Sequence, residues 1–174
     1  MASAEGTLEW QPLAQRPDLA AKPLHEAAPV PEARVSEIDP ALADTAAFCA
    51  AYDVAPEHSA NCVIIVGRRG GETRYAAVMV LATMRADVNG VIRKELDVRK
   101  CSFAPMDEAV ALTGMEYGGI TPIGLPRDWP ILVDDAVVAA DNVVIGSGLR
   151  GSKILLPSPE LLRLPNARQL RLAS

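Results

Sequence analysis

The chain has 174 residues, of which 49% are hydrophobic and 22% are charged, and its formal net charge is −5. This length suits one domain with a sizeable core, and the apolar content excludes a chain that is disordered throughout. The acidic balance argues against indiscriminate binding of nucleic acid, which is usually the property of a basic domain.

Neither the N-terminus nor the apolar runs indicate export or a membrane span. The first ten residues, MASAEGTLEW, carry acid where a signal peptide carries base. No apolar run approaches the roughly 18–20 residues that cross a bilayer. We therefore expect a cytoplasmic protein without membrane contact.

The cysteines and histidines are too few and too widely spaced for a disulfide framework or a metal centre. Cys49, Cys62 and Cys101 form no CxxC pair and are expected to be reduced, inert thiols, with a place in a pocket as the alternative for the last two. His25 and His58 lie in an expected arm and an expected loop, so they complete no Ser-His-Asp set.

Charge is distributed unevenly along the chain. Residues 1–60 hold 3 basic and 10 acidic side chains, a net of −7, whereas residues 61–174 hold 14 basic and 12 acidic ones, a net of +2. This leaves two interpretations of the basic residues in the second part: a local basic surface, or isolated solvated charges, which is the plainer one. The candidates for such a surface are Arg93, Lys94, Arg99, Lys100, Arg150 and Lys153.

The first 35 residues differ in composition from the rest. They are rich in Ala, Pro and Glu, and the prolines spread between positions 12 and 31 prevent a continuous helix. We interpret residues 1–35 as an N-terminal arm, extended or weakly helical, with a short helical piece over Leu19–His25. Residues 36–174 are interpreted as one domain.

From Asp39 the pattern changes to that of regular secondary structure. Asp39-Pro40 is a typical helix start, and the Ala-rich stretch that follows predicts a helix over Ala41–Tyr52. The β-branched run Asn61–Val66 and the apolar run Thr73–Ala82 flank a glycine-rich turn. Together they predict a β-hairpin.

The remaining elements alternate between short helices and short strands. Asp87 is placed to cap a helix that ends near Leu96. Pro105 opens a helix over Met106–Leu112, with two acids in its first turn where the helix dipole favours them. Strands are predicted over residues 99–103, 131–133, 142–145 and 153–156, and a short helix over residues 159–164. This order predicts a single α+β domain and not a regular βαβ array.

Residues 146–151 read Gly-Ser-Gly-Leu-Arg-Gly and fit the GxGxxG pattern of dinucleotide-binding loops. That chemistry needs a helix N-terminus directly after the glycines and an acid about 20 residues later. Here a strand-like run follows, Pro157 ends it, and only 23 residues remain after the last glycine. A glycine turn between two strands is therefore favoured, and nucleotide binding is the alternative.

The segment Gly118-Gly119-Ile120-Thr121-Pro122-Ile123-Gly124 is more informative. Its glycines allow a ligand to approach the backbone closely, and its proline stiffens the loop. Backbone N–H groups held in this way can bind a carbonyl or a developing oxyanion without any side chain. A structural turn is the alternative.

With its surroundings, this loop resembles the YbaK/EbsC family of aminoacyl-tRNA editing domains, which includes free-standing ProX-type deacylases and the editing insertion of bacterial prolyl-tRNA synthetases. The matching stretches are Asn61–Val66, Val80–Thr83, Thr113–Gly124, and Gly146–Gly151 with the terminal strand and Pro157–Leu162 after it. They cover about residues 36–165 in family order, which is far more specific than one glycine motif.

The resemblance implies an α+β domain with a mixed, partly closed β-sheet or barrel flanked by short helices. It implies a pocket for the 3′ end of aminoacyl-tRNA and hydrolysis of the aminoacyl ester, with no metal or organic cofactor. A synthetase is a further candidate partner, and the oligomeric state stays open. The implied catalytic positions are Gly118, Gly119 and Asn61, and the implied substrate-binding positions are Ile120, Thr121, Pro122, Gly146, Ser147, Gly148, Arg150 and Gly151.

One position departs from the family. Members commonly carry a lysine at the start of the first core strand, where this chain has Asn61. Asparagine is a neutral donor and acceptor, so a fixed positive charge is missing there unless another cation replaces it. Lys94, Lys153 and Arg85 are the candidates for that replacement. The resemblance thus implies a trans-acting deacylase, with a non-catalytic relative that binds aminoacyl-tRNA or a synthetase as the alternative.

Overall fold

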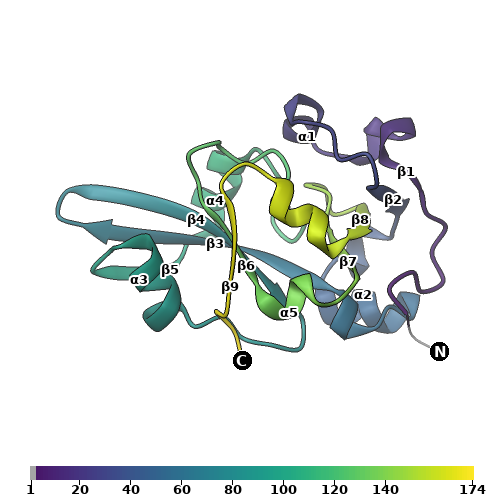
Figure 1. Cartoon of the computed structure of the whole chain (residues 1–174). Coiled ribbons are helices and arrows are strands. Elements are labelled where there is room, and N and C mark those ends of the chain that lie inside the picture. Colours follow the sequence, from purple (N-terminus) through teal and green to yellow (C-terminus); the bar gives the residue numbers. More distant parts are fainter. Residues whose placement is uncertain (1–2) are drawn as a thin grey trace.

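Two β-sheets form the centre of the molecule, and short helices surround them (Figure 1). The computed structural model describes residues 3–174. The larger sheet contains, in spatial order, β5 (Lys100–Phe103), β3 (Ala60–Arg69), β4 (Glu72–Leu81), β6 (Ile131–Asp134) and β9 (Ala167–Leu170). The smaller sheet contains β1 (Gln11–Pro12), β2 (Arg34–Glu37), β8 (Ser152–Pro157) and β7 (Asn142–Gly146).

The helices are short, and several begin at an acid or a proline. Asp87 accepts hydrogen bonds from the N–H groups of Gly90 and Val91, as expected of a helix cap. The α-helices are α1 (Lys22–Glu26), α2 (Thr45–Tyr52), α3 (Arg93–Leu96), which continues a π-helical turn over Val88–Ile92, α4 (Met106–Thr113) and α5 (Asp135–Val138). Short 3-10 helices cover Leu13–Gln15, Pro17–Leu19, Pro40–Leu42, Pro56–His58 and Ser158–Arg163.

Strand β4 is buried on both faces and separates two hydrophobic cores. Because successive side chains of a strand point to opposite faces, Ala77 and Met79 belong to the larger core, whereas Ala76 and Val78 belong to the smaller one. Its neighbours β3 and β6 pair with it antiparallel and parallel, respectively, so the sheet is mixed. The larger core fills the space between the two sheets and positions the loops that meet there.

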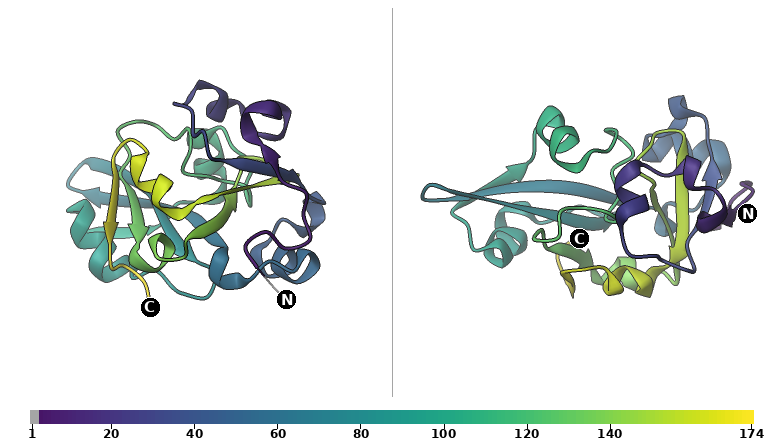
Figure 2. Two further views of the ribbon diagram at one scale, coloured as in Figure 1. Left: turned by 45° about the vertical axis from the view of Figure 1, so that its right-hand side comes forward. Right: turned by 90° about the horizontal axis from the view of Figure 1, so that it is seen from above.

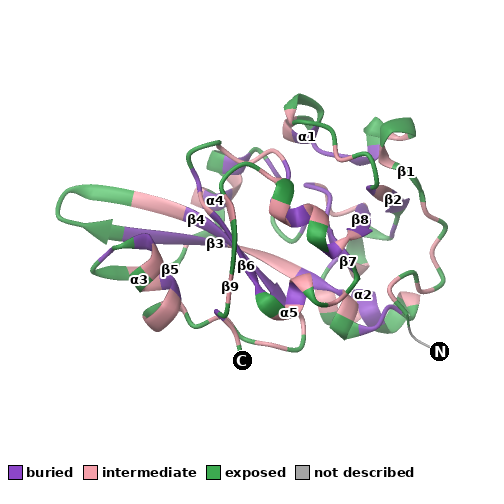
Figure 3. Ribbon diagram, in the orientation of Figure 1, coloured by how far each residue is buried: buried purple, intermediate pink, exposed green. Residues whose placement is uncertain are grey.

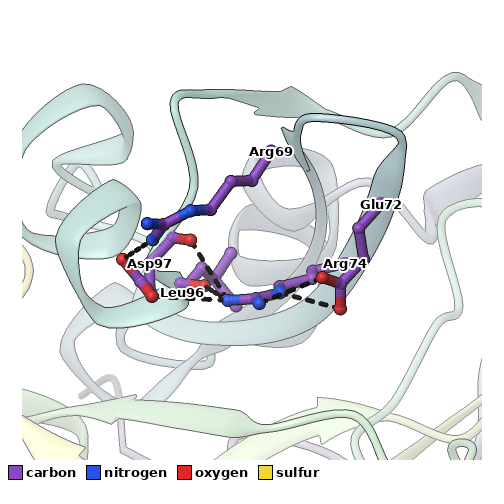
Figure 4. A network of polar contacts seen from close by, with 5 residues as sticks. All are labelled: Arg69, Glu72, Arg74, Leu96 and Asp97. Atoms are coloured by element: carbon purple, nitrogen blue, oxygen red, sulfur yellow. Dashed lines mark hydrogen bonds and ion pairs between the residues drawn. The ribbon is translucent and has the colours of Figure 1, made fainter.

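The hairpin of β3 and β4 extends beyond the other strands, and the tip of its far half, residues 68–73, is exposed (Figures 2 and 3). Two arginines of this half bind the end of α3 (Figure 4). Arg74 donates to the carbonyl oxygens of Leu96 and Asp97 at 2.9 and 3.1 Å, and Arg69 pairs with the Asp97 carboxylate. Arg74 also pairs with Glu72 at 3.2 Å. These contacts hold the hairpin against α3, while β5 pairs with β3 directly.

The N-terminal residues pack on the smaller sheet. Leu19 and Leu24 are buried in the larger core, and the Ala21 N–H donates to the Ser147 carbonyl at 3.0 Å. Strand β2 pairs with β8 across its whole length, so it joins residues on both sides of position 35. The segment expected to be an arm therefore supports the turn between β7 and β8 directly.

The structure confirms the α+β class, the long hairpin, the helix over 106–112 and the strands over 131–133, 142–145 and 153–156. The sheets do not close into a complete barrel within residues 3–174. The prediction of a continuous helix over Ala41–Tyr52 is wrong. Asp44 adopts an extended backbone (φ −63°, ψ 136°), which separates the 3-10 turn Pro40–Leu42 from α2. Strands β1, β2 and β9 and helix α5 were not expected.

Candidate functional site

A cavity of about 270 Å³ lies where β3, the start of α2, the loop after α4 and the turn after β7 meet. Each of these elements contributes polar groups to its wall. The sequence-predicted residues among its lining are Asn61, Gly118, Ile120 and Gly146. They are joined by Asp44, Thr45, Cys62, Phe103, Tyr117 and Lys153.

Asn61 is oriented by the first residue of α2. The Thr45 hydroxyl donates to the Asn61 side-chain oxygen at 2.5 Å. Asp44 has an extended backbone and ends the preceding 3-10 turn, so α2 begins at Thr45 and this residue reaches Asn61. Within residues 3–174 the Asn61 side-chain nitrogen has no acceptor, so both of its N–H groups remain available to a ligand.

Lys153 brings a buried positive charge to the same cavity. It lies on β8, is 8% exposed, and donates from Nζ to the Ala43 carbonyl at 3.1 Å. Its Nζ also lies 5.2 Å from the centre of the Phe48 ring, a cation–π contact. Burial lowers the pKa of Lys153, and the nearby Arg150 acts in the same direction. One hydrogen bond to protein leaves two further N–H donors on this ammonium group.

The loop after α4 and the turn after β7 touch backbone to backbone. A Cβ atom added to Gly146 would lie 2.4 Å from the Gly119 carbonyl oxygen, and one added to Gly119 would lie 2.7 Å from the Leu149 backbone. The Gly148 N–H donates to the Gly119 carbonyl at 2.6 Å. Only glycine permits this contact, which fixes the loop at the wall of the cavity.

Arg150 connects the loop after α4 to the residues that precede α2. Its guanidinium donates to the carbonyl oxygens of Tyr117 and Pro40, both at 3.2 Å, and lies 3.8 Å from the Asp44 carboxylate. Its backbone N–H donates to the Glu116 carboxylate at 2.7 Å. Arg150 does not line the cavity, so its contacts act by holding the loop in place.

Two backbone N–H groups of the loop are unoccupied. Those of Gly118 and Ile120 have no acceptor within residues 3–174, and both residues line the cavity. The N–H of Gly119 is already used by the Glu116 carbonyl at 3.0 Å, and that of Thr121 faces the Met115 sulfur at 3.5 Å. The cavity thus collects several hydrogen-bond donors and one buried cation, an arrangement suited to a carbonyl or an oxyanion.

The sequence model of the aminoacyl-tRNA editing domain matches residues 39–164. The chain belongs to this family. Among solved structures, a protein described as a candidate trans-editing enzyme for prolyl-tRNA synthetase is 21% identical, with a TM-score of 0.69 over 80% of this chain and 85% of that one. A hypothetical protein, APE2540, is 20% identical with a TM-score of 0.72 over 82% and 91% of the two chains. At this identity the likeness concerns the fold.

The other residues expected at the site of this editing domain lie around the cavity and not on its wall. Thr121 and Ser147 are fully buried, and the Ser147 hydroxyl lies 2.6 Å from that of Ser152. Pro122 faces a separate cavity of about 510 Å³. Gly148 (φ +88°) packs against Ala21, and Gly151 packs 3.7 Å from Pro40, measured from an added Cβ atom.

Of the cations considered as replacements for the family lysine, Lys153 alone lines the cavity. Lys94 lies in α3, and Arg85 pairs its backbone with Ser174. No sequence pattern could have singled out Lys153, because it lies in a strand next to buried apolar residues, where a lysine is usually an exposed edge residue.

The thiols and imidazoles of the editing domain form no nucleophilic site within residues 3–174. Cys62 lines the cavity, but burial raises its pKa to about 12, so it stays a protonated thiol. His25 and His58 bond to the carbonyl oxygens of Pro17 and Asn142 at 2.7 and 2.8 Å, away from the cavity wall. In the same residues no three His, Cys, Asp or Glu side chains gather as a metal site would need.

The glycine turn of residues 146–151 runs from β7 directly into antiparallel β8. No helix follows the glycines, so the feature that a dinucleotide loop requires is missing from this part of the chain. A structural turn, the favoured interpretation, is what the editing domain has here. No helix in residues 3–174 has the length and apolarity to span a bilayer.

Proposed function

We propose that this chain is a trans-acting deacylase that hydrolyses the ester bond of mischarged aminoacyl-tRNA. The observation that carries the proposal is one cavity lined by Asn61, Lys153, Gly118 and Ile120, the last two of which have backbone N–H groups without an acceptor within residues 3–174. Membership of the editing family supports the substrate class. Such a reaction takes place where tRNAs are charged, so the proposal places the chain in the cytoplasm, with a synthetase as a further candidate partner.

The reaction needs no side-chain nucleophile. Water attacks the aminoacyl carbonyl carbon, and the carbonyl oxygen becomes an oxyanion in the tetrahedral intermediate. The N–H groups of Gly118 and Ile120 and the ammonium of Lys153 are the donors that would stabilise it. The bond to the ribose oxygen then breaks, and that oxygen takes up the proton released by the attacking water. Free amino acid and uncharged tRNA are the products.

The size of the cavity suits an aminoacyl group. A volume of about 270 Å³ lies just below the range of roughly 300–1,000 Å³ that holds drug-sized ligands. The amino acid therefore fits inside, while the tRNA has to remain on the outer surface. Positioning an ester that is already activated against fixed donors accounts for much of the catalysis required.

The alternative is a relative that binds aminoacyl-tRNA or a synthetase without catalysis. Asn61 favours it, because the lysine common in the family is missing at this position. Lys153 favours catalysis, because it supplies a positive charge to the same cavity from β8. We assign to Lys153 the electrostatic role that Asn61 cannot fill.

The test is hydrolysis by the purified full chain of a panel of tRNAs, each charged with its correct or an incorrect radiolabelled amino acid. Selective release of one incorrect amino acid, above the spontaneous rate, is expected. Unchanged half-lives for the whole panel, with measurable tRNA binding, would establish the binding protein instead. In that case Asn61→Lys is expected to create activity.

A further inference from the structure

A second hollow, of about 640 Å³, adjoins the candidate cavity. It lies along edge strand β5 and is bordered by the start of α3 and the far half of β3. Phe103, the last residue of β5, lines both hollows, and Ala104 and Pro105 continue the wall on either side. A ligand too large for the cavity can therefore extend into this hollow without crossing another part of the molecule.

The hollow is basic in an acidic protein. Arg68, Arg93, Arg99 and Lys100 line it, and none of them forms an ion pair with a carboxylate of residues 3–174. Glu108 is the acid among the lining residues, so four cations and one carboxylate leave a local charge of +3, although the whole chain carries −5.

The neighbouring arginines of the same hairpin behave differently. Arg69 and Arg74 are neutralised by Asp97 and Glu72, in the network shown in Figure 4. Among the three arginines of the hairpin, Arg68 alone has no carboxylate partner within residues 3–174, and it is the one that lines the hollow. An unpaired cluster repels itself and contributes nothing to folding, so a polyanionic ligand accounts for it better than stability does.

Two exposed aromatic rings stand at the mouth of the cavity. The chain has two Phe, three Tyr and two Trp, all in the described part, and Phe103 (59% exposed) and Tyr117 (49% exposed) are the exposed ones. Both line the cavity. Aromatic rings beside a basic groove are the usual means of binding single-stranded nucleic acid, because bases stack on the rings while phosphates contact the cations.

We infer that the hollow along β5 binds the single-stranded 3′ end of the tRNA. The terminal adenosine stacks at Phe103 and Tyr117 with its aminoacyl ester in the cavity, and the preceding phosphates lie over Arg68, Arg93, Arg99 and Lys100. Lys100 is three residues from Phe103, a distance of roughly 10 Å along a strand. This inference rests on the proposed function, since it names the surface on which that substrate lies.

The test compares two double charge reversals of equal size. Arg99→Glu with Lys100→Glu alters the hollow, and Arg127→Glu with Arg171→Glu is the matched control, because neither Arg127 nor Arg171 lines the hollow. Binding of uncharged tRNA is followed by fluorescence anisotropy at several salt concentrations. We expect the first variant to bind at least tenfold more weakly than the control at low salt. Its plot of log K against log salt should also be shallower by about 1.4–1.8, because two phosphates are no longer neutralised by the protein.

A second readout concerns catalysis. The hollow variant is expected to lose at least fivefold more kcat/KM on aminoacyl-tRNA than on aminoacyl-adenosine, which lacks the phosphates. Phe103→Ala is expected to weaken the use of both substrates, because both carry the terminal adenine.

The outcomes separate this inference from the proposed function. Salt-dependent tRNA binding that is lost in the hollow variant, without hydrolysis by the wild-type chain, refutes the deacylase and supports the surface. Hydrolysis with equal tRNA binding by both double variants overturns the surface and leaves the deacylase. Polyglutamate that binds the wild-type chain through Arg99 and Lys100, where tRNA does not, would assign the hollow to an acidic protein and also overturn the inference.

Discussion

Lys153→Met tests whether the buried cation serves catalysis or the fold. Methionine has nearly the length of lysine and no charge, so it fills the same space while removing the donor. Loss of one oxyanion donor typically lowers kcat by about 10²–10³, which corresponds to roughly 2.7–4 kcal/mol. We expect a loss of this size in single-turnover deacylation, because Lys153 is the cation that lines the cavity.

The same substitution should cost little stability. Lys153 is 8% exposed, and keeping an ammonium group there carries a desolvation penalty, so apolar replacements of buried charges are often neutral or stabilising by about 1–4 kcal/mol. Against this, the Ala43 carbonyl loses its donor and Phe48 loses its cation contact, each worth about 1 kcal/mol. The expected net change in unfolding free energy for Lys153→Met therefore lies between a loss of roughly 1 kcal/mol and a gain of roughly 2 kcal/mol.

The pH dependence has a defined sign. The pKa of Lys153 in the folded chain lies below the ordinary value of 10.5, because burial disfavours the charged form. Between these two pKa values the unfolded chain binds more protons, so this group makes the wild-type chain gain stability as pH rises. Lys153→Met lacks that gain, and its stability relative to the wild-type chain should therefore fall toward pH 10.5.

Urea unfolding at pH 7, 8, 9 and 10, together with single-turnover hydrolysis at pH 7, measures both effects. Lys94→Met, which removes an exposed lysine of α3, is the matched control and should change neither. A Lys153→Met variant that loses several kcal/mol of stability would show that the lysine is structural. Full activity in that variant would refute the role assigned to the charge.

The remaining predictions concern the loop, Asn61 and Cys62. Gly119→Val should abolish hydrolysis and lower the Tm by several degrees, since its Cβ would lie 2.7 Å from the Leu149 backbone. Gly71→Ala, whose Cβ would have no atom within 4 Å, is the control and should do neither. Equal activity and Tm of the two variants would contradict the close packing at Gly119. Thr45→Val should slow hydrolysis several-fold by freeing Asn61, at a cost of about 1 kcal/mol in stability, and an unchanged rate would count against that hydrogen bond. Cys62 is half-buried, but desolvation raises its pKa to about 12, so it should react slowly with an alkylating agent at pH 8 until the chain is unfolded in urea; rapid labelling of the native chain would contradict that desolvation.

Much of the fold follows from local patterns. Asn61–Val66 and Thr73–Ala82 became β3 and β4 because β-branched runs around a glycine turn satisfy the requirements of a hairpin locally. Strands β2 and β9 could not be found in this way, since their sequences RVSE and ARQL contain no apolar run and they depend on partners distant in sequence, β8 and β6. Their pairing is decided by the tertiary structure and not by propensity.

The site was predictable in part, most directly where the backbone is the functional group. Glycines in a stiff loop signal close approach from composition alone, and the structure places Gly118 and Gly146 at one cavity. Thr45 gave no such signal, and Lys153 was one of three candidate cations that the sequence could not rank. The role of Thr45 depends on the extended residue Asp44, which interrupts the helix that the Ala-rich pattern favours. That of Lys153 depends on which face of β8 packs against α2.

The exchange Asn61→Lys with Lys153→Met provides the strictest test of the charge. Asn61→Lys alone puts a second ammonium group into a cavity whose volume of about 270 Å³ corresponds to a diameter of roughly 8 Å. Two unit charges about 8 Å apart repel by roughly 2 kcal/mol at an effective dielectric constant of about 20. The single variant should therefore be less stable and no more active than the wild-type chain.

Adding Lys153→Met removes that repulsion and leaves one cation, on β3 in place of β8. If the cavity requires a positive charge and tolerates it on either wall, the double variant should recover a substantial part of the activity that Lys153→Met loses. Such a recovery is non-additive and cannot arise from two independent structural effects. If instead the wild-type chain has no activity and Asn61→Lys alone creates it, Lys153 does not act as the cation of this site.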